Sequence, residues 1–204
     1  MRIRGIEMEL HPDEDLSNHI RRENDFFEAE ILDYMRDNHN NQKVILDIGA
    51  NIGNHSVYFA NFLKYNFLYA FEPVLDNYLL LEKNISQYPN TFASNSAVNS
   101  NGMPVHMYIN RGNMGASQVS REGEYRGAIT IDNWFREKPV SLIKIDVEGY
   151  ESEVLEGAED TIAFWHPLIL IEDWEQKYGS LLPNYEIEQD WYENHKTYLY
   201  HWKD

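Results

Sequence analysis

Apolar runs of strand length alternate with amphipathic segments of helix length along this chain. The runs read as strands are KVILDIG (43–49), NFLYAFEP (66–73), TFASNSAV (91–98), VSLIKIDVEG (140–149) and HPLILIEDW (166–174). The segments read as helices are NHSVYFANFLKY (54–65), VLDNYLLLEKNISQY (74–88), TIDNWFRE (130–137) and YESEVLEGAEDTIAF (150–164). This alternation predicts an α/β protein with a mostly parallel central sheet flanked by helices.

The two ends of the chain have a different pattern. In the polar first 42 residues, Ile20, Phe27, Ile31 and Leu32 fall roughly on one helical face. We therefore expect one or two helices there, as an N-terminal helical cap (1–42) on a main domain (43–204). Residues 98–128 are rich in Gly, Asn and Ser, which predicts one strand and a mobile loop. The aromatic-rich tail, 175–204, has no clear period.

Charge and composition exclude several classes of function. The chain has 34 acidic and 17 basic residues, a formal net charge of -17. Because nucleic-acid binding depends on Lys and Arg neutralising phosphates, we expect no nucleic-acid partner. The absence of cysteine excludes disulfides and thiolate chemistry. No apolar run is long enough for a membrane span, and the N-terminus lacks a signal-peptide core, so we favour the cytoplasm.

Polar residues end each of the predicted strands, where ligands bind in parallel α/β folds. They are Asp47, Glu72, Ser96, Asp146 and the pair Glu172-Asp173. Acidic and polar side chains at every one of these ends are hard to explain by packing alone. The sequence therefore predicts a ligand site at this edge of the sheet.

The stretch DIGANIGN (47–54) indicates which ligand this is. Its glycines, Gly49 and Gly53, do not have the G-x-G-x-x-G spacing of a dinucleotide site. Asp47 would repel a pyrophosphate but suits a ligand with a cationic amino group. Glu72, 23 positions after Gly49, is placed to accept hydrogen bonds from ribose hydroxyls. An ammonium group, a ribose and no phosphate describe S-adenosylmethionine.

Several motifs resemble the FkbM family of S-adenosylmethionine-dependent methyltransferases. They are DIGANIGNHS, FEP, NSAV, NMGAS and IKIDVEGYESEVLEGAEDTI…PLILIED, in the family's order. The resemblance implies a Rossmann-like class I methyltransferase fold, usually acting on a hydroxyl. Known members methylate sugars, polyketides and glycan termini. The family also implies that the N-terminal segment, with Phe27 and Glu28, covers the cofactor.

Carried over by position, the resemblance implies a cofactor site. In it Gly49, Ala50, Asn51 and Gly53, followed by Asn54, wrap the methionine part, and Asp47 lies behind it. Glu72 holds the ribose, and Ser96 and Ala97 border the adenine. Asn113 and Ser117 of NMGAS match a loop that reaches either the methionine carboxylate or the acceptor.

The segment KIDVE supplies the candidate catalytic residues Lys144, Asp146 and Glu148. A sugar hydroxyl is a poor acid, so a base or a metal helps to remove its proton. Lys144 and Asp146 share one face if the strand extends that far. Our first candidate for the base is Asp146. In a second arrangement, Asp146, Glu172 and Asp173 converge as three oxygen donors for Mg²⁺, which would lower the pKa of the hydroxyl.

The acceptor is less well defined than the cofactor. We expect a sugar or glycan, in particular a deoxyhexose such as rhamnose or fucose. Trp174, Tyr178, Trp191 and Tyr192 follow the last acidic strand end and would either stack on a sugar or pack in the core. The alternatives are a polyketide or other small-molecule hydroxyl, and a non-catalytic cofactor-binding module. The chain's size is also compatible with a domain of a larger glycan-synthesis protein.

Overall fold

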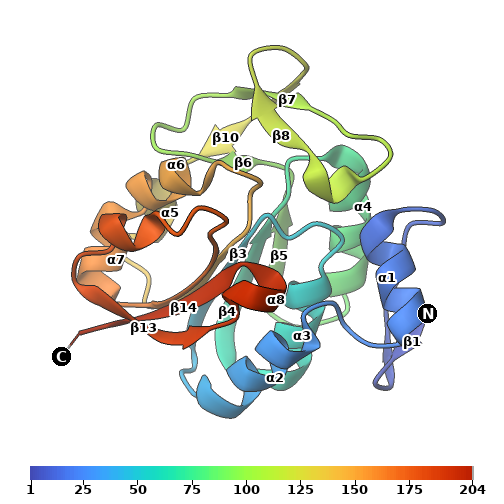
Figure 1. The fold of residues 1–204 in the computed structure, drawn as a ribbon, viewed down its shortest axis with the longest axis horizontal. Helices are drawn as coiled ribbons and strands as arrows, with labels where there is room; N and C mark the ends of the chain where they lie inside the picture. The colour runs from blue at the N-terminus through green and yellow to red at the C-terminus, as the bar shows by residue number, and fades with distance from the viewer. Residues whose placement is uncertain (204) are drawn as a thin grey trace.

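A seven-stranded sheet forms the centre of the computed structural model, which describes residues 1–203 (Figure 1). Its spatial order is β13-β14-β12-β11-β3-β4-β5. The strands are β3 (Lys43–Ile48), β4 (Tyr65–Phe71), β5 (Thr91–Ser94), β11 (Val140–Ile145), β12 (Leu168–Glu172), β13 (Tyr185–Asp190) and β14 (Thr197–Trp202). The pairs from β12 to β5 are parallel, and β14 is antiparallel to both of its neighbours. The predicted α/β fold with a mostly parallel sheet is confirmed.

Helices cover both faces of this sheet because side chains alternate along each buried strand. Ile45 packs into one hydrophobic cluster with residues of the first four helices, whereas Val44 and Leu46 pack into another with residues of α5, α6 and α7. Figure 1 shows these two groups on opposite sides. The helices are α1 (Asp15–Glu23), α2 (Ala29–Asn38), α3 (Asn54–Phe62), α4 (Leu75–Ile85), α5 (Ile131–Phe135), α6 (Glu151–Glu156), α7 (Glu159–Trp165) and α8 (Tyr192–His195).

Two predicted elements are divided in the structure. The strand predicted over 91–98 ends as β5 at Ser94 and resumes as β6 (Ala97–Val98), which pairs with β10 (Ala128–Ile129) in a separate small sheet. The helix predicted over 150–164 is interrupted at Gly157. A Cβ there would lie 2.2 Å from the carbonyl oxygen of Asn99, so this close approach requires glycine.

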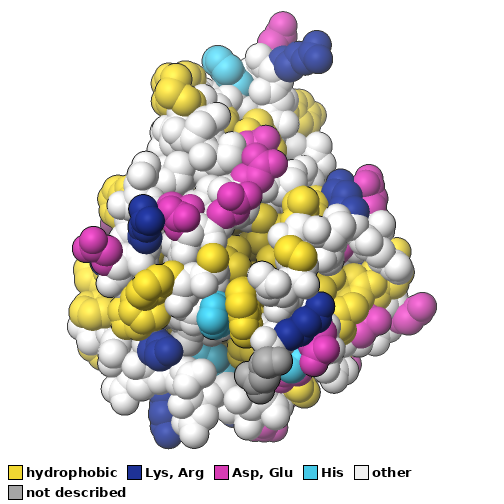
Figure 2. Space-filling view, turned by 90° about the vertical axis from the view of Figure 1, so that its left-hand side faces the viewer, with side chains coloured by type: hydrophobic (Ala, Val, Ile, Leu, Met, Phe, Trp, Pro, Cys, Tyr) yellow, Lys and Arg dark blue, Asp and Glu magenta, His cyan; other side chains and the backbone are white. Residues whose placement is uncertain are grey.

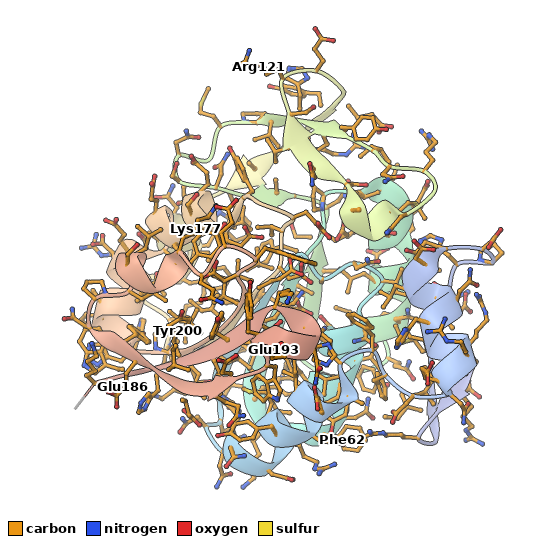
Figure 3. All side chains as sticks on the ribbon, viewed as in Figure 1. Phe62, Arg121, Lys177, Glu186, Glu193 and Tyr200 are labelled. Atoms are coloured by element: carbon orange, nitrogen blue, oxygen red, sulfur yellow. The ribbon has the colours of Figure 1, made fainter. Side chains whose placement is uncertain are left out.

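The segment predicted as one strand and a mobile loop contains a three-stranded antiparallel sheet. Its central strand β7 (Val105–Tyr108) pairs with β8 (Gln118–Ser120) and β9 (Glu124–Arg126), and a 3-10 turn, η1 (Met114–Ala116), precedes β8. Figure 3 shows Arg121 on the connection between β8 and β9, at the opposite end of the molecule from Phe62. The strand prediction is confirmed, and the other strands were not predicted.

Both ends of the chain pack onto the main domain. The N-terminal region begins with a hairpin of β1 (Arg2–Ile3) and β2 (Ile6–Glu7), and the two expected helices follow it. Ile3 and Ile20 lie in the same hydrophobic cluster as Ile45 of the central sheet. The tail supplies η2 (Tyr178–Leu181), β13, α8 and β14, for which the sequence has no clear signal. None of the helices within residues 1–203 has the length and apolar character needed to cross a membrane.

Candidate active site

A cavity of about 570 Å³ opens at the carboxyl ends of the parallel strands. This volume is in the usual range for a small-molecule or cofactor site. Glu72, Ser96, Asp146 and Glu172, from four of the predicted strand ends, line it. The predicted gathering of polar side chains at this edge is therefore confirmed for these four.

The glycine turn between β3 and α3 forms one wall of the cavity. Gly49 has a positive φ of 76°, and a Cβ there would lie 1.7 Å from the carbonyl oxygen of Asp146, so no other residue fits. Gly49, Ala50, Asn51 and Asn54 line the cavity. Gly53 does not line it. A Cβ there would lie 3.0 Å from Leu81, so Gly53 permits the packing of α3 on α4.

Glu72 presents a buried carboxylate to the same cavity. Its Oε2 accepts a hydrogen bond from the Asn51 backbone N–H, and its Oε1 accepts one from that of Val74, both at 2.8 Å. Burial raises the pKa of Glu72 to about 7, although these two backbone hydrogen bonds act in the opposite direction. Since a carboxylate has about four acceptor positions, roughly two remain for ribose hydroxyls. The residue therefore fits the adenosyl group of S-adenosylmethionine.

Asp47 was predicted as a cofactor-binding residue behind the methionine part, but it does not line the cavity. It is 0% exposed, and its Oδ2 accepts a 2.6 Å hydrogen bond from the Ser56 hydroxyl. Its Oδ1 lies 3.3 Å from Lys144 Nζ. Asp47 is thus the buried ionic partner of Lys144, and its charge is already balanced by the protein.

Lys144 also contacts the candidate base. Its Nζ lies 3.4 Å from Asp146 Oδ2 and donates a hydrogen bond to the Gly49 carbonyl at 2.8 Å. Asp146 follows the last residue of β11, and its N–H still donates to Ile48 of β3, so the strand-like register continues. The prediction that Lys144 and Asp146 share a face is confirmed. Both line the cavity, and the Asp146 side chain is 37% exposed.

Glu148 and Glu172 are two further carboxylates near Asp146. Burial raises the pKa of Asp146, and Lys144 partly offsets this shift. Burial and the charge of Asp146 raise the pKa of Glu148 to about 7. Burial, followed by the charges of Asp146 and Glu148, raises the pKa of Glu172 to about 9, so Glu172 is protonated at neutral pH. Glu148 has a positive φ of 56°, an unfavourable backbone conformation of the kind that collects at functional sites.

The predicted magnesium triad is not assembled, and this prediction is wrong. Asp146 and Glu172 line the cavity, but Asp173 does not. The Asp173 carboxylate accepts hydrogen bonds from the backbone N–H groups of Lys177 (3.0 Å) and Tyr178 (2.9 Å), so it stabilises the turn after β12. Within residues 1–203, no three carboxylate or imidazole side chains are grouped to hold a metal ion.

The four predicted loop residues line the cavity, but of the four aromatic candidates only Trp174 does. Ser96, Ala97, Asn113 and Ser117 all line the cavity, as expected for a cofactor or acceptor contact. Trp174 also lines it and is 64% exposed. The other three aromatic candidates do not line it: Tyr178 is buried, Trp191 packs edge-to-face on Tyr34, and Tyr192 stacks on Tyr198.

The sequence did not predict that Glu28 meets two histidines in the cavity wall. Glu28, just before α2, lies 3.1 Å from His55 Nε2 through its Oε2, and 3.7 Å from His195 Nδ1 through its Oε1. All three residues line the cavity. The sequence pointed to Glu28 only through the family resemblance, and His195 lies in the tail, which has no recognisable pattern.

Figure 2 shows the side of the molecule that lies at the left in Figure 1. On the face shown in Figure 2, Lys and Arg side chains are scattered among acidic and hydrophobic ones.

Comparisons with known proteins agree with this geometry. The family model of the methyltransferase FkbM domain matches residues 47–195. The hexuronic acid methyltransferase AglP of Haloferax volcanii is 28% identical over an alignment 146 residues long, which covers 66% of this chain and 58% of that protein. The chain thus spans little more than half the length of this relative.

Solved structures share the fold at low identity. The methyltransferase FkbM from Methylobacillus flagellatus KT has a TM-score of 0.59 at 17% identity, covering 79% of this chain and 44% of that one. A methyltransferase from Geobacter sulfurreducens has a TM-score of 0.56 at 10% identity, covering 95% of this chain and 92% of that one. These structures support the class I methyltransferase fold.

Proposed function

We propose that this chain, which belongs to the FkbM methyltransferase family, is an S-adenosylmethionine-dependent O-methyltransferase acting on a sugar hydroxyl. The acceptor we propose is a deoxyhexose, such as rhamnose or fucose, on a glycan. The observation that carries the proposal is the Lys144–Asp146 ion pair, in which the Asp146 carboxylate lines the cavity at the carboxyl ends of the strands.

The bound cofactor supplies an activated methyl group on a sulfonium. The chain contributes the site that holds it. Glu72 has free acceptor positions for ribose hydroxyls, and the Gly49 turn brings the backbone close to the ligand. Ser96 and Ala97 are available to border the adenine.

Asp146 is the proposed general base. Lys144 fixes the orientation of its carboxylate at 3.4 Å, which aligns it with an acceptor hydroxyl in the cavity. Burial raises the pKa of Asp146, which makes it a stronger base than an ordinary aspartate, and the charge of Lys144 acts in the opposite direction. Asp146 would accept the hydroxyl proton at its carboxylate, so that the acceptor oxygen can take the methyl group the cofactor supplies, while the bond from that methyl group to sulfur breaks and S-adenosylhomocysteine leaves with the electron pair.

The acceptor side of the cavity suits a sugar. The exposed ring of Trp174 offers a flat apolar surface for stacking. Glu172, protonated at neutral pH, can donate a hydrogen bond to a sugar oxygen. The name of AglP, a hexuronic acid methyltransferase, describes another sugar acceptor. A polyketide or other small-molecule hydroxyl is the alternative acceptor, and a non-catalytic module is the alternative function.

The test is transfer of a labelled methyl group from S-adenosylmethionine to a panel of rhamnosides, fucosides, hexuronates and polyketide alcohols. We expect a methyl ether, stable to mild alkali, on a deoxyhexose. An alkali-labile product on a hexuronate would indicate a methyl ester and would contradict the hydroxyl acceptor. Cofactor binding without transfer to any acceptor would favour the non-catalytic module.

Two variants separate the proposed roles. Asp146→Asn should lower kcat by about 10²- to 10⁴-fold, the usual contribution of a general base, while S-adenosylhomocysteine still binds. Trp174→Ala should raise KM for the acceptor without weakening cofactor binding. Trp134→Ala is its control, because Trp134 is also exposed but does not line the cavity. Equal loss of acceptor and cofactor binding in Trp174→Ala would contradict the stacking role.

A further inference from the structure

We propose that Glu28 receives the ammonium group at the methionine end of the cofactor, a role that the sequence pattern suggests for Asp47. The inference rests on the proposed function, because it concerns the same cofactor. It names a binding residue in the N-terminal segment, outside the glycine turn and the strand ends.

Asp47 is unsuited to this role. Its carboxylate is buried beneath the turn, accepts the Ser56 hydroxyl and lies 3.3 Å from Lys144 Nζ. A second cation would have to displace Lys144 to reach it. Asp146 does reach the cavity, but its carboxylate is also held by Lys144.

Contacts between the start of α3 and the Phe27–Glu28 pair place Glu28 beside the glycine turn. The Asn54 side chain, at the start of α3, accepts a hydrogen bond from the Phe27 N–H and donates one to the Phe27 carbonyl, both at 3.0 Å. His55, the next residue of α3, approaches Glu28 Oε2 at 3.1 Å. The carboxylate therefore lies beside the residues that are expected to wrap the methionine part.

His55 and His195 contact the Glu28 carboxylate and leave it charged. His55 Nδ1 lies 3.4 Å from the Asn54 amide nitrogen, so both ring nitrogens of His55 have protein neighbours. The Glu28 side chain is 12% exposed, and the residue lines the cavity. Burial raises the pKa of Glu28, but the contact with His55 and the charge of Lys144 outweigh it, so the net shift is downward. The result is an ionised carboxylate with open acceptor positions.

The backbone at Glu28 is strained, which favours a functional role. Its φ of 57° and ψ of 38° place it in the left-handed region, where a side chain is unfavourable. Glycine would adopt this conformation without the steric penalty. A glutamate kept at such a position, in a cavity, is the pattern expected where binding requires the side chain.

The experiment compares two ligands by isothermal titration calorimetry. S-Adenosylhomocysteine carries the amino-acid end, and 5′-methylthioadenosine has the same adenosine and sulfur without it. We expect Glu28→Gln to weaken S-adenosylhomocysteine binding about ten- to a hundredfold, the usual range for one charge-assisted hydrogen bond, and to leave 5′-methylthioadenosine binding unchanged.

Glu30→Gln is the matched control. Glu30 lies 2.9 Å from the same His195, on Nε2, but it is half exposed and does not line the cavity. The Glu30→Gln variant should bind both ligands as the wild type does. Glu28→Gly should lose the same affinity for S-adenosylhomocysteine while remaining folded, because glycine accepts the left-handed backbone.

The outcomes are distinct. Equal weakening of both ligands in Glu28→Gln, or no weakening of either, would overturn the role of Glu28 and leave the proposed function standing. A wild-type chain that binds neither ligand would overturn the proposed function itself.

Discussion

Lys144 and Asp47 face each other across two parallel strands, β11 and β3, with Nζ 3.3 Å from Oδ1. The same ammonium reaches Asp146 on the cavity wall. Although burial opposes the charge, Asp146 and then Asp47 raise the pKa of Lys144 above its ordinary value. One lysine thus neutralises a carboxylate in the core and orients another in the cavity, which couples the stability of the sheet to the geometry of the site.

Removal of this lysine should destabilise the fold. Lys144→Met leaves the buried Asp47 without its cationic partner, and breaking a buried pair in this way costs about 3–5 kcal/mol. Denaturant unfolding measures the loss, with the exposed Lys64→Met as control. The double variant Asp47→Asn/Lys144→Met should recover part of it. A Lys144→Met variant as stable as the control would refute the coupling.

Stability should fall as the pH rises, because of Glu172. Its pKa in the folded chain is about 9, compared with an ordinary value of 4.5, so the folded state holds its proton more tightly. This stabilisation is complete below pH 4.5 and disappears as the pH approaches 9. Glu148, with a pKa of about 7, adds to the lower part of this range.

The isosteric Glu172→Gln has no proton to lose and should flatten the dependence. The slopes of the two proteins should differ by at most about 1.4 kcal/mol per pH unit, the value for one proton. Urea unfolding at several pH values between 5 and 8.5 provides the comparison. Parallel curves for the wild type and Glu172→Gln would show that Glu172 does not carry this proton.

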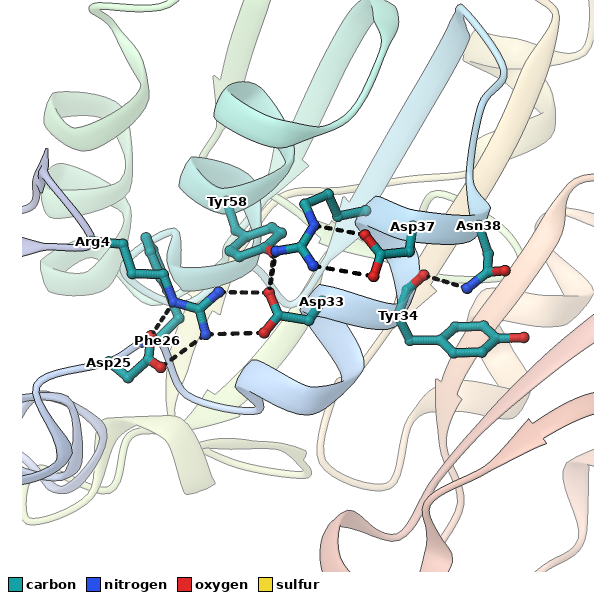
Figure 4. Close-up of polar contacts among 9 residues, drawn as sticks. Arg4, Asp25, Phe26, Asp33, Tyr34, Asp37, Asn38 and Tyr58 are labelled. Carbon is teal, nitrogen blue, oxygen red and sulfur yellow. Dashed lines mark hydrogen bonds and ion pairs between the residues drawn. The ribbon is translucent and has the colours of Figure 1, made fainter.

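Arg4 joins the N-terminal hairpin to the loop before α2 and to α2 itself (Figure 4). Its guanidinium donates hydrogen bonds to Asp25 at 2.6 and 2.8 Å and to Asp33 at 2.5 and 3.1 Å. Arg4→Ala should destabilise the chain by roughly 1 kcal/mol, because these pairs are partly exposed. The effect should shrink at high salt. Arg22→Ala, which removes an exposed pair with Glu23, should have little effect, and an equal loss in both variants would contradict the estimate for Arg4.

Tyr178 stabilises the turn that contains Glu148 through a hydrogen bond to Glu151. Its hydroxyl donates a 2.7 Å hydrogen bond to Glu151 Oε2, and Glu151 Oε1 accepts the N–H groups of Val147 and Gly149. Tyr178→Phe should cost about 1.5–3 kcal/mol, the range for a hydrogen bond to a charged group, and should lower kcat while S-adenosylhomocysteine binds as before. Tyr65→Phe, which removes an exposed hydrogen bond, is the control. Unchanged kcat in Tyr178→Phe would show that the turn is held without it.

The sequence predicted the parts of the fold that depend on local pattern. Buried parallel strands appear as continuous apolar runs, so β3, β4, β11 and β12 and the helices between them were predicted in order. The same pattern placed Glu72, Asp146 and Glu172 at one edge. The antiparallel strands β13 and β14 were missed because their aromatic-rich sequence lacks a clear two-residue period.

The predictions that failed depended on side-chain direction or on contacts distant in sequence. Asp47 and Asp173 lie at strand ends as predicted, but neither lines the cavity. Asp47 pairs with Lys144 of the neighbouring strand, and Asp173 accepts hydrogen bonds from the backbone of the turn that follows it. Glu28 and His195 are 167 residues apart and meet only in the folded chain (195 − 28). A linear pattern contains no information on such encounters.

The most direct test of the methyltransferase function is calorimetric titration of the wild-type chain and Glu72→Gln with S-adenosylhomocysteine. We expect one binding site per wild-type chain, independent of added Mg²⁺, and weaker binding in Glu72→Gln because its amide has fewer acceptor positions for ribose hydroxyls. Absence of binding to the wild type would contradict the assignment of this cavity to the adenosyl cofactor and, with it, the proposed methyl transfer.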